Sequence, residues 1–181
     1  MSKLSILLYP DSRLRTVARP VSQIDDKIRQ LIKDMGETMY AAPGVGLAAT
    51  QVDQHVRLIV IDISPTRDQL RAFINPELIE ASGDADVEEG CLSVPGVYEK
   101  TQRAQQIRVR ALGADGAPFE HAAEGLEAVC IQHEMDHLDG KVFVERLSRL
   151  KRQRILARIK KRQRDGDQRA SASRSSGTNI L

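Results

Sequence analysis

The sequence contains no Trp, three Tyr and three Phe among 181 residues. Aliphatic side chains must therefore build most of the core, which a 41% apolar content can fill. The two cysteines, Cys91 and Cys130, are too few for a disulfide framework. No apolar run approaches the roughly 18 residues of a membrane span, and no basic-then-apolar leader follows Met1. These absences argue against a membrane protein and a secreted disulfide module, and we expect a cytoplasmic protein.

Charge is distributed unevenly along the chain. Residues 146–169 contain 11 Lys and Arg against 2 Asp and Glu, a net charge of +9, whereas residues 1–145 contain 15 against 23, a net charge of −8. The apolar residues of the basic stretch recur at helical spacing: Leu150, Ile155, Leu156 and Ile159. We predict a basic C-terminal helix over 148–164 and a disordered polar tail over 165–181. The helix either packs on its own domain with a solvated face or binds an anionic surface such as RNA.

The segment Gln132–His137 reads Gln-His-Glu-Met-Asp-His and contains the pattern H-E-x-x-H. On a helix, residues four apart share a face, so His133 and His137 can offer two imidazoles to one metal ion. Glu134 lies about 100° further round, beside the metal, where it can accept a proton from water. The spacing alone is equally compatible with two ordinary helix histidines, so other residues must decide.

A metal site with three protein ligands and one open position needs one more donor, and a thiolate is a strong candidate. We predict that Cys91, which follows Glu88-Glu89-Gly90, is this donor, although an isolated cysteine is often a small buried hydrophobe. Cys130 falls on the helix face of His133 and His137. The three residues span about two helical turns, too far to converge on one ion, so we interpret Cys130 as a pocket wall.

The segment Pro43–Gln51 is rich in small residues and contains Gly44 and Gly46. It lacks the spacing and the lysine of the phosphate-binding pattern G-x-x-x-x-G-K-[ST]. Glycines allow close backbone approach, so we predict a ligand-facing loop here, with a plain helix-to-strand connector as the alternative.

Apolar periodicity predicts an amphipathic helix over 25–42. Strands are predicted at Arg57–Ile63, at Ala72–Ile79 with a break at Pro76, and at Gln106–Leu112, before a hairpin turn at Asp115-Gly116. This order predicts an α+β fold with antiparallel sheets around a central metal-binding helix, flanked by N-terminal and C-terminal helices. We expect a catalytic domain over 1–147, followed by the basic helix and the tail.

Three segments resemble, in order and approximate spacing, the three signature motifs of the bacterial peptide deformylases. They are Gly44-Val45-Gly46-Leu47-Ala48-Ala49-Thr50-Gln51, Glu89-Gly90-Cys91-Leu92-Ser93 and Gln132-His133-Glu134-Met135-Asp136-His137. The likeness covers about residues 4–150. Three ordered motifs are far more specific than H-E-x-x-H alone.

The resemblance implies a hydrolase that removes the N-formyl group from N-formylmethionine of newly synthesised polypeptides and releases formate. It implies one divalent metal ion held by Cys91, His133 and His137. That metal is typically Fe(II), with Zn(II), Ni(II) or Co(II) as substitutes. The resemblance also implies the catalytic groups: Glu134 as general base and acid, and the Gln51 side chain and Leu92 backbone N–H as donors to the developing oxyanion.

By the same resemblance, the methionine side chain enters an apolar pocket. Its expected walls are Val45, Gly46, Leu126, Val129, Cys130 and His133. The peptide is expected to lie extended and to pair its backbone with Val45, Gly46 and Gly90 as an added strand. Some members of the family carry an Arg a few residues after Cys-Leu-Ser, but this chain has Pro95–Tyr98 there, so no such contact is assigned. Glu89 is expected to support a metal ligand without binding the metal.

The expected partners are N-formylmethionyl nascent peptides and, through the basic helix, the ribosome. We expect a monomer with no membrane association. Two other hypotheses compete. An H-E-x-x-H peptidase needs a third His or Glu ligand, for which His55 and His121 have no supporting pattern. An RNA-binding module with a structural metal leaves Gln51 and Glu134 without a purpose.

Overall fold

The computed structural model describes residues 3–161, so the predicted tail over 165–181 lies outside the described residues. The chain divides into two compact units, one over Met1–Phe143 and one beginning at Val144. The elements up to the end of the first unit are η1 (Ser12–Arg15), α1 (Asp26–Ala41), β1 (Gly46–Ala48), η2 (Ala49–Val52), β2 (Leu58–Ile61), β3 (Arg71–Ser82), β4 (Ala85–Cys91), β5 (Val94–Arg103), β6 (Gln106–Leu112), β7 (Pro118–Glu124) and α2 (Gly125–Leu138), and η3 (Phe143–Arg146) spans the boundary. Over the described residues, no helix is both long enough and apolar enough to cross a bilayer.

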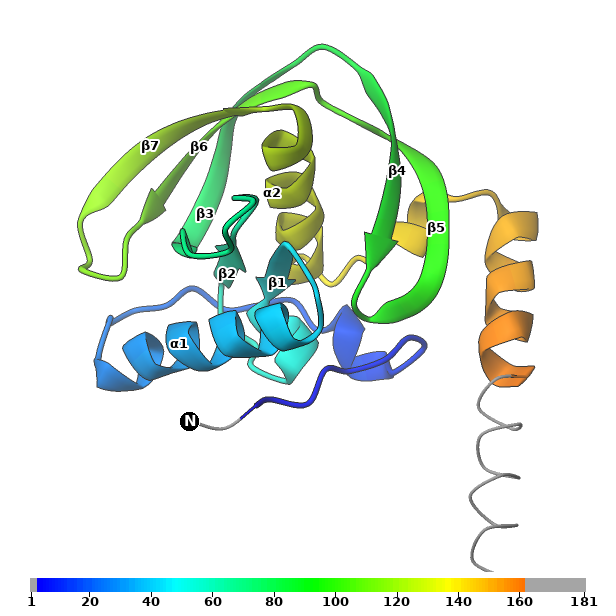
Figure 1. The fold of residues 1–181 in the computed structure, drawn as a ribbon, viewed down its shortest axis with the longest axis horizontal. Helices are drawn as coiled ribbons and strands as arrows, with labels where there is room; N and C mark the ends of the chain where they lie inside the picture. The colour runs from blue at the N-terminus through cyan, green and yellow to red at the C-terminus, as the bar shows by residue number, and fades with distance from the viewer. Residues whose placement is uncertain (1–2, 162–181) are drawn as a thin grey trace, which may run out of the picture. The chain divides into compact units, whose positions relative to one another are not determined.

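Two antiparallel sheets enclose helix α2. One has five strands in the order β1-β2-β3-β6-β7, and the other is the hairpin of β4 and β5. Figure 1 shows α2 between the five-stranded sheet and this hairpin, with α1 lying beside β1 and β2. The predicted α+β fold with antiparallel sheets around the H-E-x-x-H helix is therefore confirmed.

The core lies on both faces of the five-stranded sheet, and β2 shows why. Its four residues are all buried because successive side chains point to opposite faces and both faces are covered. Ile59 and Ile61 pack in one cluster with residues of α2, including Ile131. Leu58 and Val60 pack in another with residues of α1, including Met35. The chain thus uses aliphatic residues, as its composition requires, to fix α2 against the sheet.

The predicted helix over 25–42 is confirmed as α1. Asp25 is its N-cap, and its carboxylate accepts a hydrogen bond from the Ile28 N–H at 3.0 Å. The helix ends just before Pro43–Gln51, so it positions the start of this segment of small residues.

Two predictions, one for a loop and one for a strand, need correction. The segment Pro43–Gln51 is not simply a loop, because it contains β1 and most of η2. Strand β3 does not end at Pro76 but continues through it to Ser82. The pairing with β6 shifts register between Ile74 and Glu77, so proline, which has no N–H, lies where the ladder is already irregular.

The β4–β5 hairpin was not predicted. Most residues of β4 are at least partly exposed, so the strand lacks the apolar alternation that identifies a half-buried strand. Its register pairs Glu89 with Glu99 and Gly90 with Tyr98. This hairpin carries the second signature segment.

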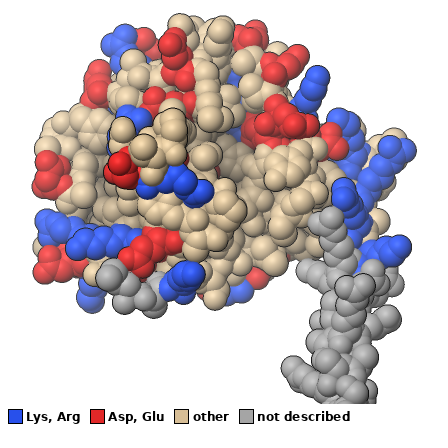
Figure 2. Space-filling model, in the orientation of Figure 1, with Lys and Arg blue, Asp and Glu red and all other residues tan. Residues whose placement is uncertain are grey.

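In the second unit, residues 149–161 form a helix; of the predicted helix over 148–164, Ser148 precedes it and residues 162–164 lie outside the described residues. The Ser148 side-chain oxygen accepts a hydrogen bond from the Lys151 N–H at 3.4 Å. Ile155 is buried, whereas Leu150 is exposed. Lys and Arg side chains gather over this helix (Figure 2).

Candidate metal centre and catalytic site

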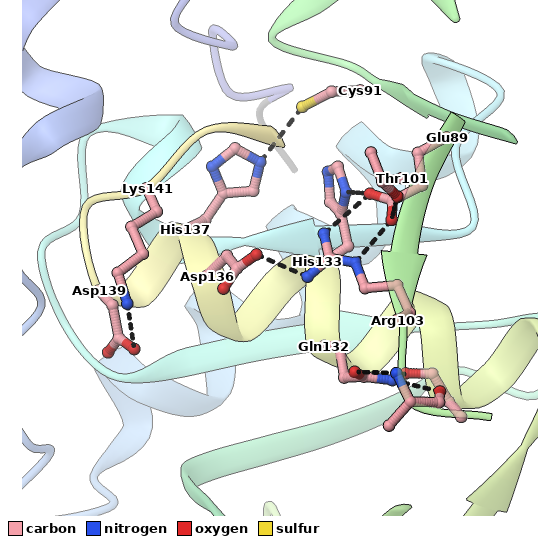
Figure 3. Close-up of polar contacts among 12 residues, drawn as sticks. Glu89, Cys91, Thr101, Arg103, Gln132, His133, Asp136, His137, Asp139 and Lys141 are labelled. Carbon is pink, nitrogen blue, oxygen red and sulfur yellow. Dashed lines mark hydrogen bonds and ion pairs between the residues drawn. The ribbon is translucent and has the colours of Figure 1, made fainter. Parts of the chain in front are cut away.

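Three potential metal donors converge from two elements. Cys91 ends β4, and His133 and His137 lie one turn apart on α2. Their donor atoms all lie within 4.8 Å of one another, and Cys91 Sγ is 3.2 Å from His137 Nε2. Figure 3 shows Cys91 facing His137 across the gap between hairpin and helix. The residues singled out by spacing are thus brought together, whereas His55 and His121 are not part of this group.

The donor set fits a metal ion. One sulfur and two imidazoles suit Zn and Fe, and three protein ligands leave a position for water or substrate. His133 uses its Nδ1 for a 2.8 Å contact with Glu89 Oε2, so Nε2 is the ring nitrogen left for a metal. His137 Nδ1 is buried without a hydrogen-bond partner among the described residues. Two neighbouring buried imidazoles and a thiol have little other reason to meet.

Glu89 lies behind His133 in a cluster of buried polar side chains. Its carboxylate accepts hydrogen bonds from the Arg103 guanidinium at 2.6 and 2.8 Å and from the Thr101 hydroxyl. Burial alone would raise the pKa of Glu89, but the hydrogen bonds from Arg103 and His133 hold that pKa well below its usual range. Glu89 is therefore a fixed anion that orients the His133 ring.

Glu134 lies beside the donors and is not one of them. Only 5% of the residue is exposed, and its Oε2 atom has no hydrogen-bond partner among the described residues. Burial raises the pKa of Glu134 to about 7, against the opposing effect of His133 and Arg103. A carboxyl group that titrates near neutrality can both take and return a proton.

Gln51, at the third position of η2, has its amide held in one orientation. The side-chain carbonyl accepts a hydrogen bond from the Ala48 N–H at 2.8 Å. The amide nitrogen donates to Ser93 Oγ at 3.1 Å and lies 3.6 Å from Cys91 Sγ. The amide N–H groups of Gln51 therefore face the same space as the thiol.

A cavity of about 500 Å³ lies at these groups, although the predicted ligand His137 is not on its wall. The predicted site residues on its wall are Val45, Gly46, Gln51, Gly90, Cys91, Leu92, His133 and Glu134. Gly46 is required there, because a Cβ atom at this position would lie 2.5 Å from Glu134 Oε1. The backbone at Gly46 therefore lies close to the side chains of Glu134 and Cys130, as expected for a glycine that allows close approach.

The other predicted pocket residues, Leu126, Val129 and Cys130, are not on the wall of that cavity. Leu126 is exposed, and Val129 is buried. The Cys130 thiol is buried 3.6 Å from the Val45 carbonyl oxygen, and burial raises its pKa well above the ordinary value. A thiol that stays protonated is a poor ligand, which agrees with the choice of Cys91.

Sequence patterns missed Arg103, Thr101 and Ser93. Arg103 lies in a polar stretch where an arginine ordinarily faces solvent, and only its 4% exposure reveals its role. Ser93 ends the second signature segment but carried no chemical assignment. Tyr98 also lines the cavity, and its side chain is largely exposed.

Comparison with known proteins gives one consistent result. The family model described as polypeptide deformylase matches residues 3–153. The chain is 59% identical to a peptide deformylase of Chromobacterium violaceum over 164 residues, which cover 91% of this chain and 98% of that one. It is 58% identical to a peptide deformylase of Pseudomonas aeruginosa, with 91% and 98% covered. A crystal structure of a peptide deformylase from Legionella pneumophila superposes with a TM-score of 0.88 at 46% identity, covering 92% and 98%.

Proposed function

The chain belongs to the polypeptide deformylase family, and on that premise we propose that Cys91, His133 and His137 hold one divalent metal ion in its active site. The enzyme is a hydrolase that removes the N-formyl group from N-formylmethionine of newly synthesised polypeptides. The observation that carries the assignment of residues is the convergence of these three donors next to the cavity that Cys91, His133 and the buried Glu134 line.

A bound divalent ion supplies Lewis acidity, which polarises the formyl carbonyl and lowers the pKa of water toward about 7. We propose Fe(II) as the natural ion, with Zn(II), Ni(II) or Co(II) as substitutes. Affinity generally rises from Fe(II) to Zn(II), and iron beside a thiolate is prone to oxidative loss. Protein purified in air should contain mostly zinc and turn over slowly, and anaerobic loading with Fe(II) should speed it. Equal rates for the two forms would contradict this choice of metal.

Glu134 handles the protons in the proposed mechanism. Its carboxylate takes a proton from the attacking water and later gives a proton to the leaving amine. The raised pKa of about 7 suits both steps, since the group exchanges protons readily near neutral pH. Its unpartnered Oε2 is free to bond with water or substrate.

The developing oxyanion is met by the Gln51 side chain and the Leu92 backbone N–H. The orientation of Gln51 supports this role, because the Ala48 N–H holds its carbonyl and its amide nitrogen lies 3.6 Å from Cys91 Sγ at the cavity. A donor fixed before the reaction stabilises charge without reorganising. Leu92 follows Cys91 directly and lines the same cavity.

The substrate backbone pairs as an added strand with Val45, Gly46 and Gly90 in this proposal. Strand β1 is the edge strand of the five-stranded sheet, so its outer side can accept one. The methionine side chain enters an apolar pocket. Besides Val45 and Gly46, its proposed walls are Leu126, Val129, Cys130 and His133.

The decisive assay compares formate release from a formyl-methionyl peptide with cleavage of an unformylated peptide. We expect release of formate and no cleavage of peptide bonds, because an H-E-x-x-H peptidase needs a His or Glu, not a Cys, as its third metal ligand. Glu134→Gln should lower the rate by about 10²–10⁴ while keeping its metal. Glu127→Gln is the matched control, because Glu127 lies on the same helix but pairs with Arg71. Loss of metal from Glu134→Gln would refute its role as a proton carrier.

The basic helix over 148–164 is proposed to dock the enzyme on the ribosome. Its substrate exists as a nascent chain, which a docked enzyme meets at high effective concentration in the cytoplasm. The cations of residues 149–161 can contact RNA phosphates, and such binding weakens steeply with salt. We propose a monomer, because Cys91, His133, His137, Glu134 and Gln51 come together within one chain.

Truncation after Ser148 should abolish co-sedimentation with ribosomes at low salt and spare turnover of a free formyl-methionyl peptide. Ile155 is buried, so a second variant should keep the helix and change the exposed Lys151, Arg154 and Arg158 to Gln. Truncation after Lys161 is the control for the tail. Co-sedimentation that survives in both the Ser148 truncation and the Gln variant would place docking elsewhere.

A further inference from the structure

The metal donors belong to two parts of the fold that do not share a sheet. Cys91 lies at the end of β4 in the two-stranded β4–β5 sheet, whereas His133 and His137 lie on α2. Among residues 3–161, the hairpin forms a sheet separate from the five-stranded sheet on which α2 packs. The distance from the thiol to the imidazoles therefore depends on side chains that join hairpin and helix.

Arg103, the last residue of β5, makes such a connection on both sides. Its Nε and Nη2 atoms donate to the two carboxylate oxygens of Glu89 on β4 at 2.6 and 2.8 Å. Its Nη1 atom donates to Asp136 Oδ2 on α2 at 2.6 Å. Only 1% of the Arg103 side chain is exposed. Figure 3 shows the guanidinium between the carboxylates of Glu89 and Asp136.

Glu89 links Arg103 to a proposed metal donor. Both of its carboxylate oxygens accept hydrogen bonds from Arg103, and its Oε2 also lies 2.8 Å from His133 Nδ1. Asp136 immediately precedes His137 on α2. The same guanidinium thus contacts two carboxylates that lie next to the histidines: Glu89, which meets the His133 ring, and Asp136, which directly precedes His137.

A second contact joins the same two parts close by. The Ala104 N–H donates to Gln132 Oε1 at 3.0 Å, and Gln132 Nε2 donates to the Ala104 carbonyl at 2.9 Å. Gln132 and Ala104 are the chain neighbours of His133 and Arg103. This amide pair keeps hairpin and helix adjacent, while Arg103 is placed to set their detailed spacing.

We propose that Arg103 is a positioning residue that, by bridging Glu89 and Asp136, sets the spacing of Cys91 from His133 and His137 and so determines how tightly the active site holds its metal. This inference rests on the proposed metal site. The planar fork of arginine is required, because a lysine ammonium cannot donate to both oxygens of Glu89 and to Asp136 in these directions. Partners behind metal ligands typically change metal affinity by about 10–100-fold when they are altered.

The test loads wild type and Arg103→Lys with Co(II), whose visible spectrum reports thiolate coordination, and measures Co(II) dissociation into a chelator. We expect Arg103→Lys to lose Co(II) about 10–100-fold faster and to show an altered spectrum before it does. Arg71→Lys is the matched control, because Arg71 joins β3 to the same helix through Glu127 and lies away from the donors. It should lose Co(II) at the wild-type rate.

Arg103→Lys also removes a buried contact, so Asp136→Asn provides a milder variant that keeps the Arg103–Glu89 fork. It should show the same changes at smaller magnitude, with normal thermal stability of the metal-free protein. If both variants hold Co(II) like wild type, or lose it only in proportion to lost stability with an unchanged spectrum, the inference is wrong. Formate release by wild type is measured alongside. Its absence would refute the proposed function, whereas normal release with unaltered Co(II) retention in Arg103→Lys would refute this inference alone.

Discussion

The wall of the cavity formed by β1 and η2 is held by main-chain hydrogen bonds, whereas the wall formed by the β4–β5 hairpin depends on buried charged side chains. On the first wall, β1 pairs with β2 over Gly46–Ala48, and the Val45 carbonyl accepts a hydrogen bond from the Asp62 N–H at 2.9 Å. On the second wall, Glu89, Arg103 and Asp136 carry the connection to α2. The proposed metal donor Cys91 lies on the second wall, and the proposed oxyanion donor Gln51 lies on the first.

Because the two walls are held differently, substitutions on them should have different effects on the rate and on the metal content. Main-chain pairing survives most single substitutions, so changes on the sheet wall should alter the rate and spare the metal. A buried charge cluster loses its balance when one member changes, so changes on the hairpin wall should release the metal. Four substitutions, from the largest expected effect to the smallest, test this separation.

Cys91→Ser should remove nearly all bound metal and nearly all activity, because a hydroxyl is a far poorer ligand than a thiolate at neutral pH. Metal content of the purified protein and formate release measure the two losses. Cys130→Ser is the control, since its thiol lies 3.6 Å from the Val45 carbonyl oxygen and is not one of the three clustered donors. A Cys91→Ser protein that keeps its metal, beside a Cys130→Ser protein that loses it, would reverse the assignment of the cysteines.

Gln51→Leu should lower kcat by about 10²–10³ with little change in metal content, as expected for the loss of one oxyanion donor. Steady-state kinetics on a formyl-methionyl peptide, together with metal analysis, provide the measurement. Gln54→Leu is the matched control, because Gln54 is an exposed glutamine just beyond η2. Loss of metal from Gln51→Leu would mean that the sheet wall also holds the ion, and the comparison of the walls would fail.

Gly46→Ala should lower activity by up to about 10²-fold, because the added methyl group would meet Glu134 Oε1 at 2.5 Å and Cys130 Sγ at 2.7 Å and displace the carboxylate. Gly44→Ala should have a smaller effect, since its methyl group meets the movable end of the Leu92 side chain at 2.7 Å. Both variants should keep their metal. The order of the two kcat values checks the prediction, and equal losses would contradict it.

Asp62→Asn should have the smallest effect on activity and a measurable effect on stability. Burial would raise the pKa of Asp62, but hydrogen bonds from Ser64, Tyr40 and the Gln69 N–H lower it to about 2. A carboxyl group with a lowered pKa stabilises the fold above its unfolded value near 3.8, and that contribution disappears as the pH falls toward about 2. The variant should lose about 1–3 kcal/mol at neutral pH, and the gap should close in acid. Urea unfolding at several pH values measures it.

Local patterns predicted those elements whose residues repeat with a clear period. Strand β6 follows the predicted limits Gln106–Leu112, because its residues alternate between core and solvent. Helix α1 lies within the predicted range 25–42, because its cap and its apolar stripe are both local signals. The passage of β3 through Pro76 was not predictable, because it depends on a register shift against β6, a strand 30 residues away in the sequence.

Three signature segments, each made of residues close together along the chain, were enough to identify the family and the types of donor, and local periodicity indicated the α+β order of elements. The tertiary structure alone decided that Cys91 meets His137 at 3.2 Å and that Arg103 is buried between Glu89 and Asp136. No local pattern marks an arginine for burial. The physical reason is that the charges of Arg103 and its two carboxylates become mutually satisfied only when the hairpin folds onto α2, so their role depends on contacts between distant segments.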